Sequence, residues 1–368
     1  MITDALWSDY NNDGRPDLIV VGELMPVTIY ENTGSGLVRV RQSGLERYTG
    51  LWNSITGGDF DKDGDMDYVV GNIGQNNFYN ITGQYPLRVY AKDLDNNGSI
   101  DPILSCYFKS EAGEMVEYPV HFWDELYGQS PLFRKQFSRY RQYGLTDMKA
   151  LLQPHDTSGM EVFTANYPYT SYVENNGDGT FDMRPLPKRA QFSPVNGMVT
   201  MDANGDGNLD LLLTGNDYGN EVFSGRYDAG EGLLLIGDGQ GAFSEMPSRT
   251  SGFAVCGDAK ALAKLHGVAG ELVIATQNLD SLRIFSTGPA PPGKPIFEPQ
   301  PGDSWVEIVH KDGKHERIEF YYGSGYLSQS TRRIVLPENV AAIHVYDYSG
   351  KERRVSLNAI TRINDKEK

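Results

Sequence analysis

A nine-residue acidic segment at 59–67 constrains this chain more than any other feature. It reads Asp-Phe-Asp-Lys-Asp-Gly-Asp-Met-Asp, with carboxylates at its first, third, fifth and ninth positions and Gly64 at the sixth. Alternate residues of a turning backbone can direct their oxygens to one centre, and calcium takes about six to eight oxygen ligands. Glycine supplies the sharp turn that a side chain would obstruct. The segment therefore predicts a calcium-binding loop built from one short stretch of chain.

The pattern occurs four times, in segments that we number loop 1 (9–17), loop 2 (59–67), loop 3 (93–101) and loop 4 (202–210). Every copy keeps an oxygen donor at positions 1, 3, 5 and 9 and glycine at position 6, and its seventh residue would bind through the backbone carbonyl. One copy alone is compatible with a solvated turn, since Asp and Gly are ordinary turn residues. Four copies in register favour about four calcium sites. The predicted ligand sets are Asp9, Asn11, Asp13, Arg15 and Asp17; Asp59, Asp61, Asp63, Asp65 and Asp67; Asp93, Asp95, Asn97, Ser99 and Asp101; and Asp202, Asn204, Asp206, Asn208 and Asp210.

The residues around the loops exclude an EF-hand, which needs a bidentate Glu at position 12 and a helix on each side. Position 12 is apolar in every copy, namely Val20, Val70, Leu104 and Leu213. Loops 1, 2 and 4 run directly into short β-branched or leucine-rich segments, which are typical of buried strands. The loops are therefore expected to connect strands, and the fold class to be all-β.

The spacing of the loops predicts a repeat architecture. They begin at residues 9, 59, 93 and 202, so successive loops start 50, 34 and 109 residues apart. Turns rich in Asn and Gly recur after them at 30–36, 173–181 and 235–243, and such turns are strong hairpin signals. A repeat of about 35–60 residues with three or four strands is typical of β-propeller blades. A fifth unit, at about 254–286, has the strands without a calcium loop, and Asp258 in it is expected to be a turn residue.

The long third interval predicts a helical insertion at about 118–153. Within it, 130–140 is expected to form one amphipathic helix with Pro131 near its start, because Leu132, Phe133, Phe137 and Tyr140 fall at helical spacing. These apolar residues would seat the helix on the propeller, or alternatively form a partner surface together with Arg134, Arg139 and Arg141.

A proline-rich segment gives the expected domain boundary. Propeller repeats are assigned to 1–288, a linker to 289–300 and a small β domain to 301–368. The segments expected to form strands in the last domain are 305–309, 315–320, 333–336 and 342–346, with turns at Asp312-Gly313 and Ser349-Gly350.

Composition limits the possible partners and location. The formal charge of −16 argues against nucleic-acid binding, and no apolar run reaches the length of a membrane span. Cys106 and Cys256 are either free thiols, which we favour, or one disulfide. Calcium loops of this type suit a millimolar extracellular supply. Because Met1 leads directly into the first strand without a signal peptide, we expect a piece of a longer exported chain, or numbering from its first ordered residue.

The loops beginning at Asp9, Asp59, Asp93 and Asp202 resemble the DxDxDGxxD calcium loops of the FG-GAP/VCBS repeat family. The segment 323–330 is similar to the ASPIC/UnbV module that accompanies such repeats in cartilage acidic protein-like bacterial surface proteins. The resemblance covers nearly the whole chain except the insertion. It implies a calcium-stabilised β-propeller outside the cytoplasm, at the cell surface or outer membrane. Ligands vary across the family, so the fold does not fix the function.

Function is expected to be non-enzymatic: a surface binding or scaffold protein that docks a protein partner or glycan, and possibly an accessory subunit of an outer-membrane complex. The sequence has no GxSxG, HExxH or phosphate-loop motif, and its histidines form no close pair at metal-ligand spacing. Two alternatives stay open. A polysaccharide lyase or hydrolase would need an acid/base carboxylate outside the loops, for which Glu125 is the candidate. A lectin could stack sugars on Trp7, Trp52, Trp123 or the segment 167–169, although aromatic residues more often anchor strands.

Overall fold

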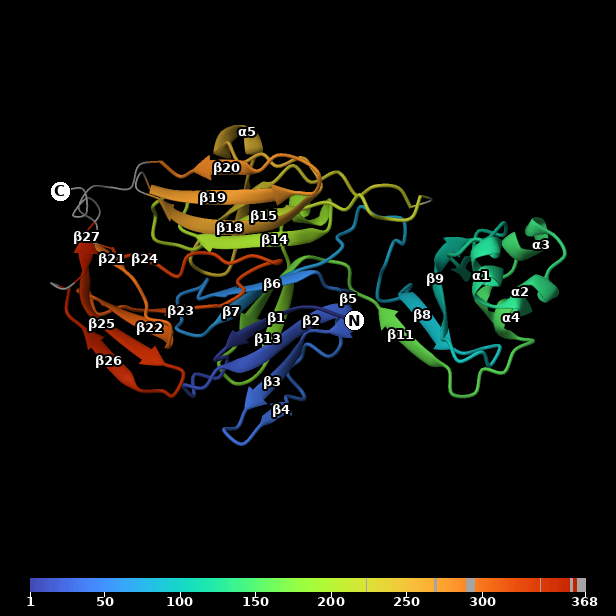
Figure 1. The fold of residues 1–368 in the computed structure, drawn as a ribbon, viewed down its shortest axis with the longest axis horizontal. Helices are drawn as coiled ribbons and strands as arrows, with labels where there is room; N and C mark the ends of the chain where they lie inside the picture. Colours follow the sequence, from blue (N-terminus) through green and yellow to red (C-terminus); the bar gives the residue numbers. More distant parts are fainter. Residues whose placement is uncertain (223, 268–269, 289–294, 338, 358–359, 363–368) are drawn as a thin grey trace.

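The fold was examined in a computed structural model that describes residues 1–222, 224–267, 270–288, 295–337, 339–357 and 360–362. Strands dominate the described chain and its helices are short, which confirms the all-β class. Three antiparallel sheets of four strands or more and a smaller fourth follow the repeats expected from sequence, and a separate small β domain lies at the C-terminal end (Figure 1).

Each repeat sheet is an antiparallel meander. Acidic loops 1, 2 and 4 join the first two strands of repeat sheets 1, 2 and 3, whereas repeat sheet 4 has no acidic loop. Repeat sheet 1 contains β1 (Ile2–Ser8), β2 (Asp17–Pro26), β3 (Thr28–Asn32) and β4 (Leu37–Arg39), with β5 (Thr49–Leu51) also paired to β2. Repeat sheet 2 contains β6 (Ser54–Gly58), β7 (Asp67–Gly71), β12 (Ser171–Asn175) and β13 (Phe181–Pro185). Repeat sheet 3 contains β14 (Val195–Met201), β15 (Asp210–Gly215), β16 (Leu233–Gly237) and β17 (Phe243–Met246). Repeat sheet 4 contains β18 (Ala259–Gly267), β19 (Gly270–Gln277) and β20 (Arg283–Ser286).

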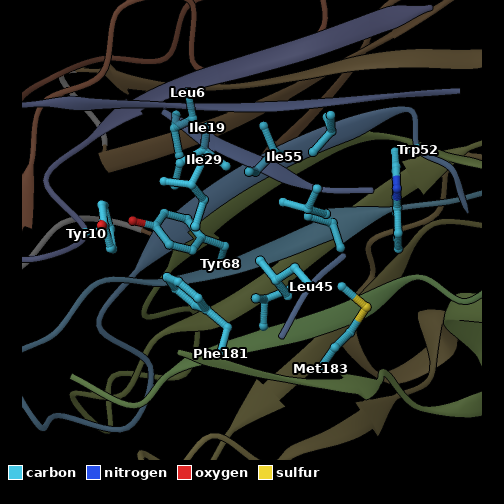
Figure 2. Packing of buried hydrophobic residues seen from close by; sticks show 14 of the residues in the cluster. Leu6, Tyr10, Ile19, Ile29, Leu45, Trp52, Ile55, Tyr68, Phe181 and Met183 are labelled. Atoms are coloured by element: carbon cyan, nitrogen blue, oxygen red, sulfur yellow. The ribbon is translucent and has the colours of Figure 1, made fainter. Parts of the chain in front are cut away.

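Three apolar cores lie between successive repeat sheets and explain the continuous apolar runs in the sequence. Successive residues of a strand point to opposite faces. In β7, Tyr68 and Val70 therefore enter the core shared with repeat sheet 1, while Val69 enters the core shared with repeat sheet 3. Figure 2 shows Leu6 and Ile19 of sheet 1 in the first of these cores together with Tyr68. The first strands β1, β6, β14 and β18 pack in series, so the sheets are stacked in sequence order.

An inserted unit interrupts repeat sheet 2. Strands β7 and β12 are paired, so the chain leaves the sheet after Gly71 and returns at Ser171. The inserted unit has its own sheet of β10 (Met115–Pro119), β9 (Asp101–Lys109), β8 (Leu87–Lys92) and β11 (Glu161–Ala165), and it projects from the repeats (Figure 1). Loop 3 joins β8 to β9 in this unit. The expectation that every loop opens a repeat of one series is therefore wrong for loop 3.

The helices of the inserted unit also differ from expectation. They are α1 (Trp123–Gln129), α2 (Pro131–Gln136), α3 (Tyr140–Gly144) and α4 (Met148–Leu152). The single helix expected at 130–140 is broken, because Phe137 has an extended backbone and its ring packs against Trp123 and Tyr143. Phe133 is fully buried in a core with Leu94 of loop 3, so the helices cover the inserted sheet and not the repeat sheets.

The C-terminal domain consists of two small sheets around one core. One sheet contains β24 (Ile334–Val335), β21 (Pro295–Phe297) and β27 (Thr361–Arg362). The other contains β23 (His315–Glu319), β22 (Asp303–His310), β25 (Val340–Asp347) and β26 (Glu352–Val355), close to the strands expected from sequence. Residues 289–294 of the expected linker lie outside the described residues, and β21 occupies part of its remainder.

The C-terminal domain contacts both ends of the stack of repeat sheets. Ser8 Oγ of β1 donates to Glu319 Oε2 of β23 at 2.6 Å. On the other side, the Thr331 amide donates to Lys264 O of β18 at 2.7 Å. In the described part of the chain the repeat sheets do not close into a ring, and the domain lies between sheet 1 and sheet 4 (Figure 1). Two remaining short helices, α5 (Ser248–Ser251) and the 3-10 turn Lys188–Gln191, lie on loops of the repeats.

Candidate metal centres in the acidic loops

The four loops share one backbone conformation, which places their side chains in equivalent positions. Glycine at position 6 has a φ of +83° in loop 1, +96° in loop 2, +89° in loop 3 and +85° in loop 4. Position 4 is also left-handed in every loop, through Asn12, Lys62, Asn96 and Gly205. Only glycine adopts this region without cost, and Asn tolerates it best among the others. The left-handed conformation at position 4 cannot be predicted from the sequence pattern, because Lys62 in loop 2 is not a residue type that favours it.

The carboxylate at position 1 organises the loop by accepting backbone amides from within it. Asp93 accepts the amides of Asn97 at 3.0 Å and Gly98 at 2.8 Å. Asp202 likewise accepts those of Asp206 at 3.1 Å and Gly207 at 2.9 Å. Asp9 accepts the amides of Asp13 and Gly14 in the same way, so the first residue holds loops 1, 3 and 4 in shape.

The carboxylate at position 9 ties each repeat loop to a distant strand. Asp17 is fully buried and accepts the Tyr10 amide at 3.3 Å and the Asn32 amide, at the end of β3, at 2.6 Å. Asp67 binds Phe60 and Asn175 in the same way, and Asp210 binds Ala203 and Gly237. The loop motif predicts these residues only as cation ligands. Their structural contacts depend on the third strand of the sheet, which no local motif identifies.

Loop 2 is the best fit to a cation. Asp59 is only 6% exposed, and its Oδ1 is buried without a hydrogen-bond partner. One carboxylate oxygen from each of Asp59, Asp61 and Asp67 lies within 4.8 Å of the others. Burial raises the pKa of Asp59 to about 7 and that of Asp67 to about 7. A buried carboxylate oxygen with no partner is costly, and a divalent cation at the centre of this cluster would satisfy it.

Loop 3 also gathers its carboxylates. Asp93, Asp95 and Asp101 each bring an oxygen within 4.8 Å of the other two. Burial raises the pKa of Asp101. Ser130 Oγ, immediately before α2, donates to Asp95 Oδ2 at 3.1 Å, which connects the helices to the loop. Loop 3 therefore fits a cation and lies at the base of the helical cover of the inserted unit.

Loop 4 carries the predicted oxygen donors but fewer carboxylates than loop 2, because position 3 is Asn204. Asn204 accepts the Asp206 amide through Oδ1 at 2.9 Å and donates to Asp206 Oδ2 at 2.8 Å. Hydrogen bonds from the Asn208 amide and Asn204 lower the pKa of Asp206, so its carboxylate stays ionised. The donor set is compatible with a cation, with less unsatisfied charge than loop 2.

Loop 1 already has cationic partners from the protein. Arg317 of β23 donates to Asp9 Oδ2 at 2.8 Å and also to Asn12, while Arg15 pairs with Asp13. Arg317 is 9% exposed and Asp9 is 2% exposed, so their ion pair is buried. Of the four loops, loop 1 therefore fits a cation least well. No local motif identifies Arg317 as a partner of loop 1, because it lies about three hundred residues away in the sequence.

Loops 1, 2 and 4 are connected to one another along one side of the repeat sheets. Asn12, at position 4 of loop 1, donates to Asp65 at position 7 of loop 2. Lys62, at position 4 of loop 2, donates to Asn208 Oδ1 at position 7 of loop 4 at 2.6 Å. The position-7 side chains thus join neighbouring loops, whereas loop 3 lies apart in the inserted unit.

The other candidates from sequence are mostly structural. Glu125 accepts the Phe122 amide at 2.8 Å and caps α1. Trp52 is fully buried, with its indole N–H donating to Met25 O at 2.8 Å. Trp123 packs in the core of the inserted unit, and the hydroxyl of Tyr167 bonds that of Ser171. Among the aromatic residues proposed to stack sugars, only Trp7 is more than half exposed, at 52%. Cys106 and Cys256 are free thiols, as favoured from sequence.

Two histidines on one hairpin of the C-terminal domain make separate contacts with glutamates. His310 lies 3.2 Å from Glu316 and His315 lies 2.7 Å from Glu307, on opposite strands of one hairpin. Neither pair includes a second histidine, so the described residues give this hairpin no histidine metal site.

Comparisons with known proteins identify one segment. Residues 9–70, which contain loops 1 and 2, match the FG-GAP-like repeat. No curated protein matches the chain. Among solved structures, the crystal structure of the V. cholerae biofilm matrix protein Bap1 aligns with 97% of this chain and 72% of its own, at 11% sequence identity and a TM-score of 0.15. A TM-score this low supports no conclusion about fold or function. Residues 9–70 thus contain an FG-GAP-like repeat, as the sequence motif predicted.

Proposed function

We propose that this chain is a calcium-stabilised, non-enzymatic binding or scaffold protein of the cell surface. Its repeat sheets would be blades of a β-propeller, and its C-terminal domain a module of the ASPIC/UnbV type. The stacked sheets with their loops on one side support the first assignment, and the two small sheets around residues 323–330 are compatible with the second.

The buried, unpartnered Asp59 Oδ1 carries the proposal. It lies among carboxylates whose mutual repulsion and burial disfavour the cation-free state. Calcium accepts many oxygen ligands in flexible geometry, which suits a loop that offers carboxylates and a backbone carbonyl. Asp59, Asp61, Asp63 and Asp67 would hold the ion through side chains and Asp65 through its carbonyl. The ion supplies charge neutralisation and rigidity and no reaction step.

A location outside the cytoplasm would suit the same chemistry, because extracellular calcium modules fill at about millimolar calcium. None of the described helices is long and apolar enough to cross a membrane. The surface of the repeats and inserted unit would then be available to a protein partner or a glycan, in line with the binding role. Glu125 gives the enzymatic alternative no support, because its carboxylate is engaged in capping α1.

The first test of the proposal is calcium titration of the intact chain by calorimetry, with thermal unfolding in calcium and in chelator. We expect calcium to raise the melting temperature, because it binds the folded state only. Asp59→Asn should remove one bound ion and part of this shift. Asp65→Asn is the matched control in the same loop, since position 7 binds through its backbone. Equal melting temperatures with calcium and chelator, or an unchanged number of ions in Asp59→Asn, would refute the proposal.

A further inference from the structure

A cavity of about 460 Å³ lies between repeat sheet 1 and the C-terminal domain. Trp7, Pro16 and Asn32 line it from the repeat sheet, and Ser304, Tyr322 and Tyr348 line it from the domain. Small-molecule sites have volumes of about 300–1,000 Å³ and occur preferentially where domains meet. The cavity borders loop 1 through Asp9 and Pro16 and lies outside loop 2 and the helical insertion, so the calcium site proposed in loop 2 leaves its purpose unexplained.

Three aromatic side chains of this cavity are unusually open to solvent. Trp7 is 52% exposed, Tyr322 is 56% exposed and Tyr348 is 45% exposed. The side chain of Tyr322 is fixed, because its hydroxyl donates to Pro301 O at 2.9 Å and Arg332 stacks 4.2 Å from its ring centre. Within the described chain, neither the Trp7 indole N–H nor the Tyr348 hydroxyl has a protein hydrogen-bond partner. The cavity therefore offers three exposed aromatic side chains, two of which carry polar groups that no protein group of the described chain satisfies.

The charges at the base of the cavity are already compensated. Arg317 donates to Asp9 at 2.8 Å and lies 3.2 Å from Glu319. Glu319 further accepts the Ser8 hydroxyl at 2.6 Å and the Tyr321 hydroxyl at 3.0 Å. A cationic ligand would find no unpaired carboxylate here. No lysine or arginine is among the lining residues, and the guanidinium of Arg332 beside Tyr322 is already bonded to the Tyr322 hydroxyl and the Asp303 carbonyl. The lining thus selects for an uncharged ligand.

We infer that this cavity binds a neutral sugar unit of a glycan. A pyranose presents apolar C–H faces that stack on aromatic rings, and hydroxyls at its rim that pair with free polar groups. Trp7 and Tyr348 would supply both contacts, and Tyr322 a further wall. The inference deepens the proposed binding function by naming its ligand class and site. Because the walls come from two domains, the site also gives the docked position of the C-terminal domain a purpose.

The test is binding of the intact, calcium-loaded chain to an array of neutral and acidic oligosaccharides, followed by tryptophan-fluorescence titration with the neutral oligosaccharide that binds best. We expect neutral glycans to bind and Trp7→Ala to weaken binding about tenfold or more, as loss of a stacking ring would. Tyr348→Phe, which keeps the ring and removes only the hydroxyl, should weaken it less. Tyr326→Ala is the control, because Tyr326 is similarly exposed on the same domain but lies outside the cavity.

The outcomes separate this site from the wider proposal. Absence of neutral-glycan binding, binding only to acidic glycans, or unchanged affinity in Trp7→Ala would each overturn the inference. Because each variant is also melted in calcium and in chelator, misfolding is detected independently. If no glycan binds but calcium still raises the melting temperature, the sugar site is refuted and the calcium-stabilised scaffold is not. If calcium does not raise the melting temperature of the unmodified chain, the proposed function is refuted.

Discussion

The aspartates at position 9 of the repeat loops have a structural role that does not depend on a cation. In repeat sheet 1, Asp17 accepts amides from Tyr10, which precedes β2 in loop 1, and from Asn32, which is the last residue of β3. The loop motif identifies this residue from sequence as an oxygen donor. Its partner at the end of the third strand is invisible there, because the pairing forms only when the sheet is assembled.

Replacing Asp17 tests this role where a cation fits least well. We expect Asp17→Asn to lower the free energy of unfolding by about 1.5–3 kcal/mol, because a buried amide group would face backbone donors that now bond a carboxylate. The loss should be equal in calcium and in chelator, as measured by urea unfolding. Asp13→Asn, whose carboxylate pairs with the exposed Arg15, serves as control. A loss confined to calcium would show that Asp17 acts as a ligand instead.

The raised pKa values in loop 2 predict a dependence of stability on pH. Burial raises the pKa of Asp59 and of Asp67 to about 7, above the ordinary value near 4. Between these values the folded, calcium-free protein binds more protons than the unfolded chain, so its stability falls as the pH rises. Calcium bound in loop 2 would replace those protons. The calcium-induced rise in melting temperature should therefore grow from pH 5 to pH 8, and a constant rise across this range would contradict the assignment.

At the level of elements, local pattern predicted strands well and helices poorly. The strands β2, β7 and β15 follow directly from short apolar runs after glycine-bearing loops. The break at Phe137 follows instead from tertiary packing, since its ring fills the space between Trp123 and Tyr143. Spacing of apolar residues within 130–140 cannot reveal such a break, because the rings that hold Phe137 in place, Trp123 and Tyr143, lie outside that segment.

The contact between β23 and loop 1 should hold the C-terminal domain in place. Arg317→Ala leaves the buried Asp9 without its partner, which is expected to cost about 3–5 kcal/mol. Hydrogen exchange should then rise across 303–320 and in loop 1. The control is Arg333→Ala, because its pair with Glu298 is exposed and worth about 1 kcal/mol or less. If both variants exchange at the same rate, the domain is held by other contacts.

At the scale of the whole molecule, the sequence predicts the repeats but not that one unit is inserted between two strands of another. Pairing of β7 with β12 encloses the inserted unit within repeat sheet 2. Loop 3 carries the same motif as its neighbours, so counting loops alone placed it in the series of repeats. The contact of the C-terminal domain with sheet 1 joins Ser8 and Glu319, from opposite ends of the chain, and its contact with sheet 4 joins Thr331 and Lys264. Neither contact has a local sequence signal.

The central claim is that the acidic loops hold calcium, and long-wavelength anomalous diffraction from crystals grown in millimolar calcium tests it most directly. We predict anomalous peaks within coordination distance of Asp59 and Asp61 in loop 2 and of Asp93 and Asp95 in loop 3. A chelator-treated crystal should lack both peaks. Loops without anomalous density in calcium, with Asp59 Oδ1 satisfied by a protein group or a water molecule instead, would contradict the claim.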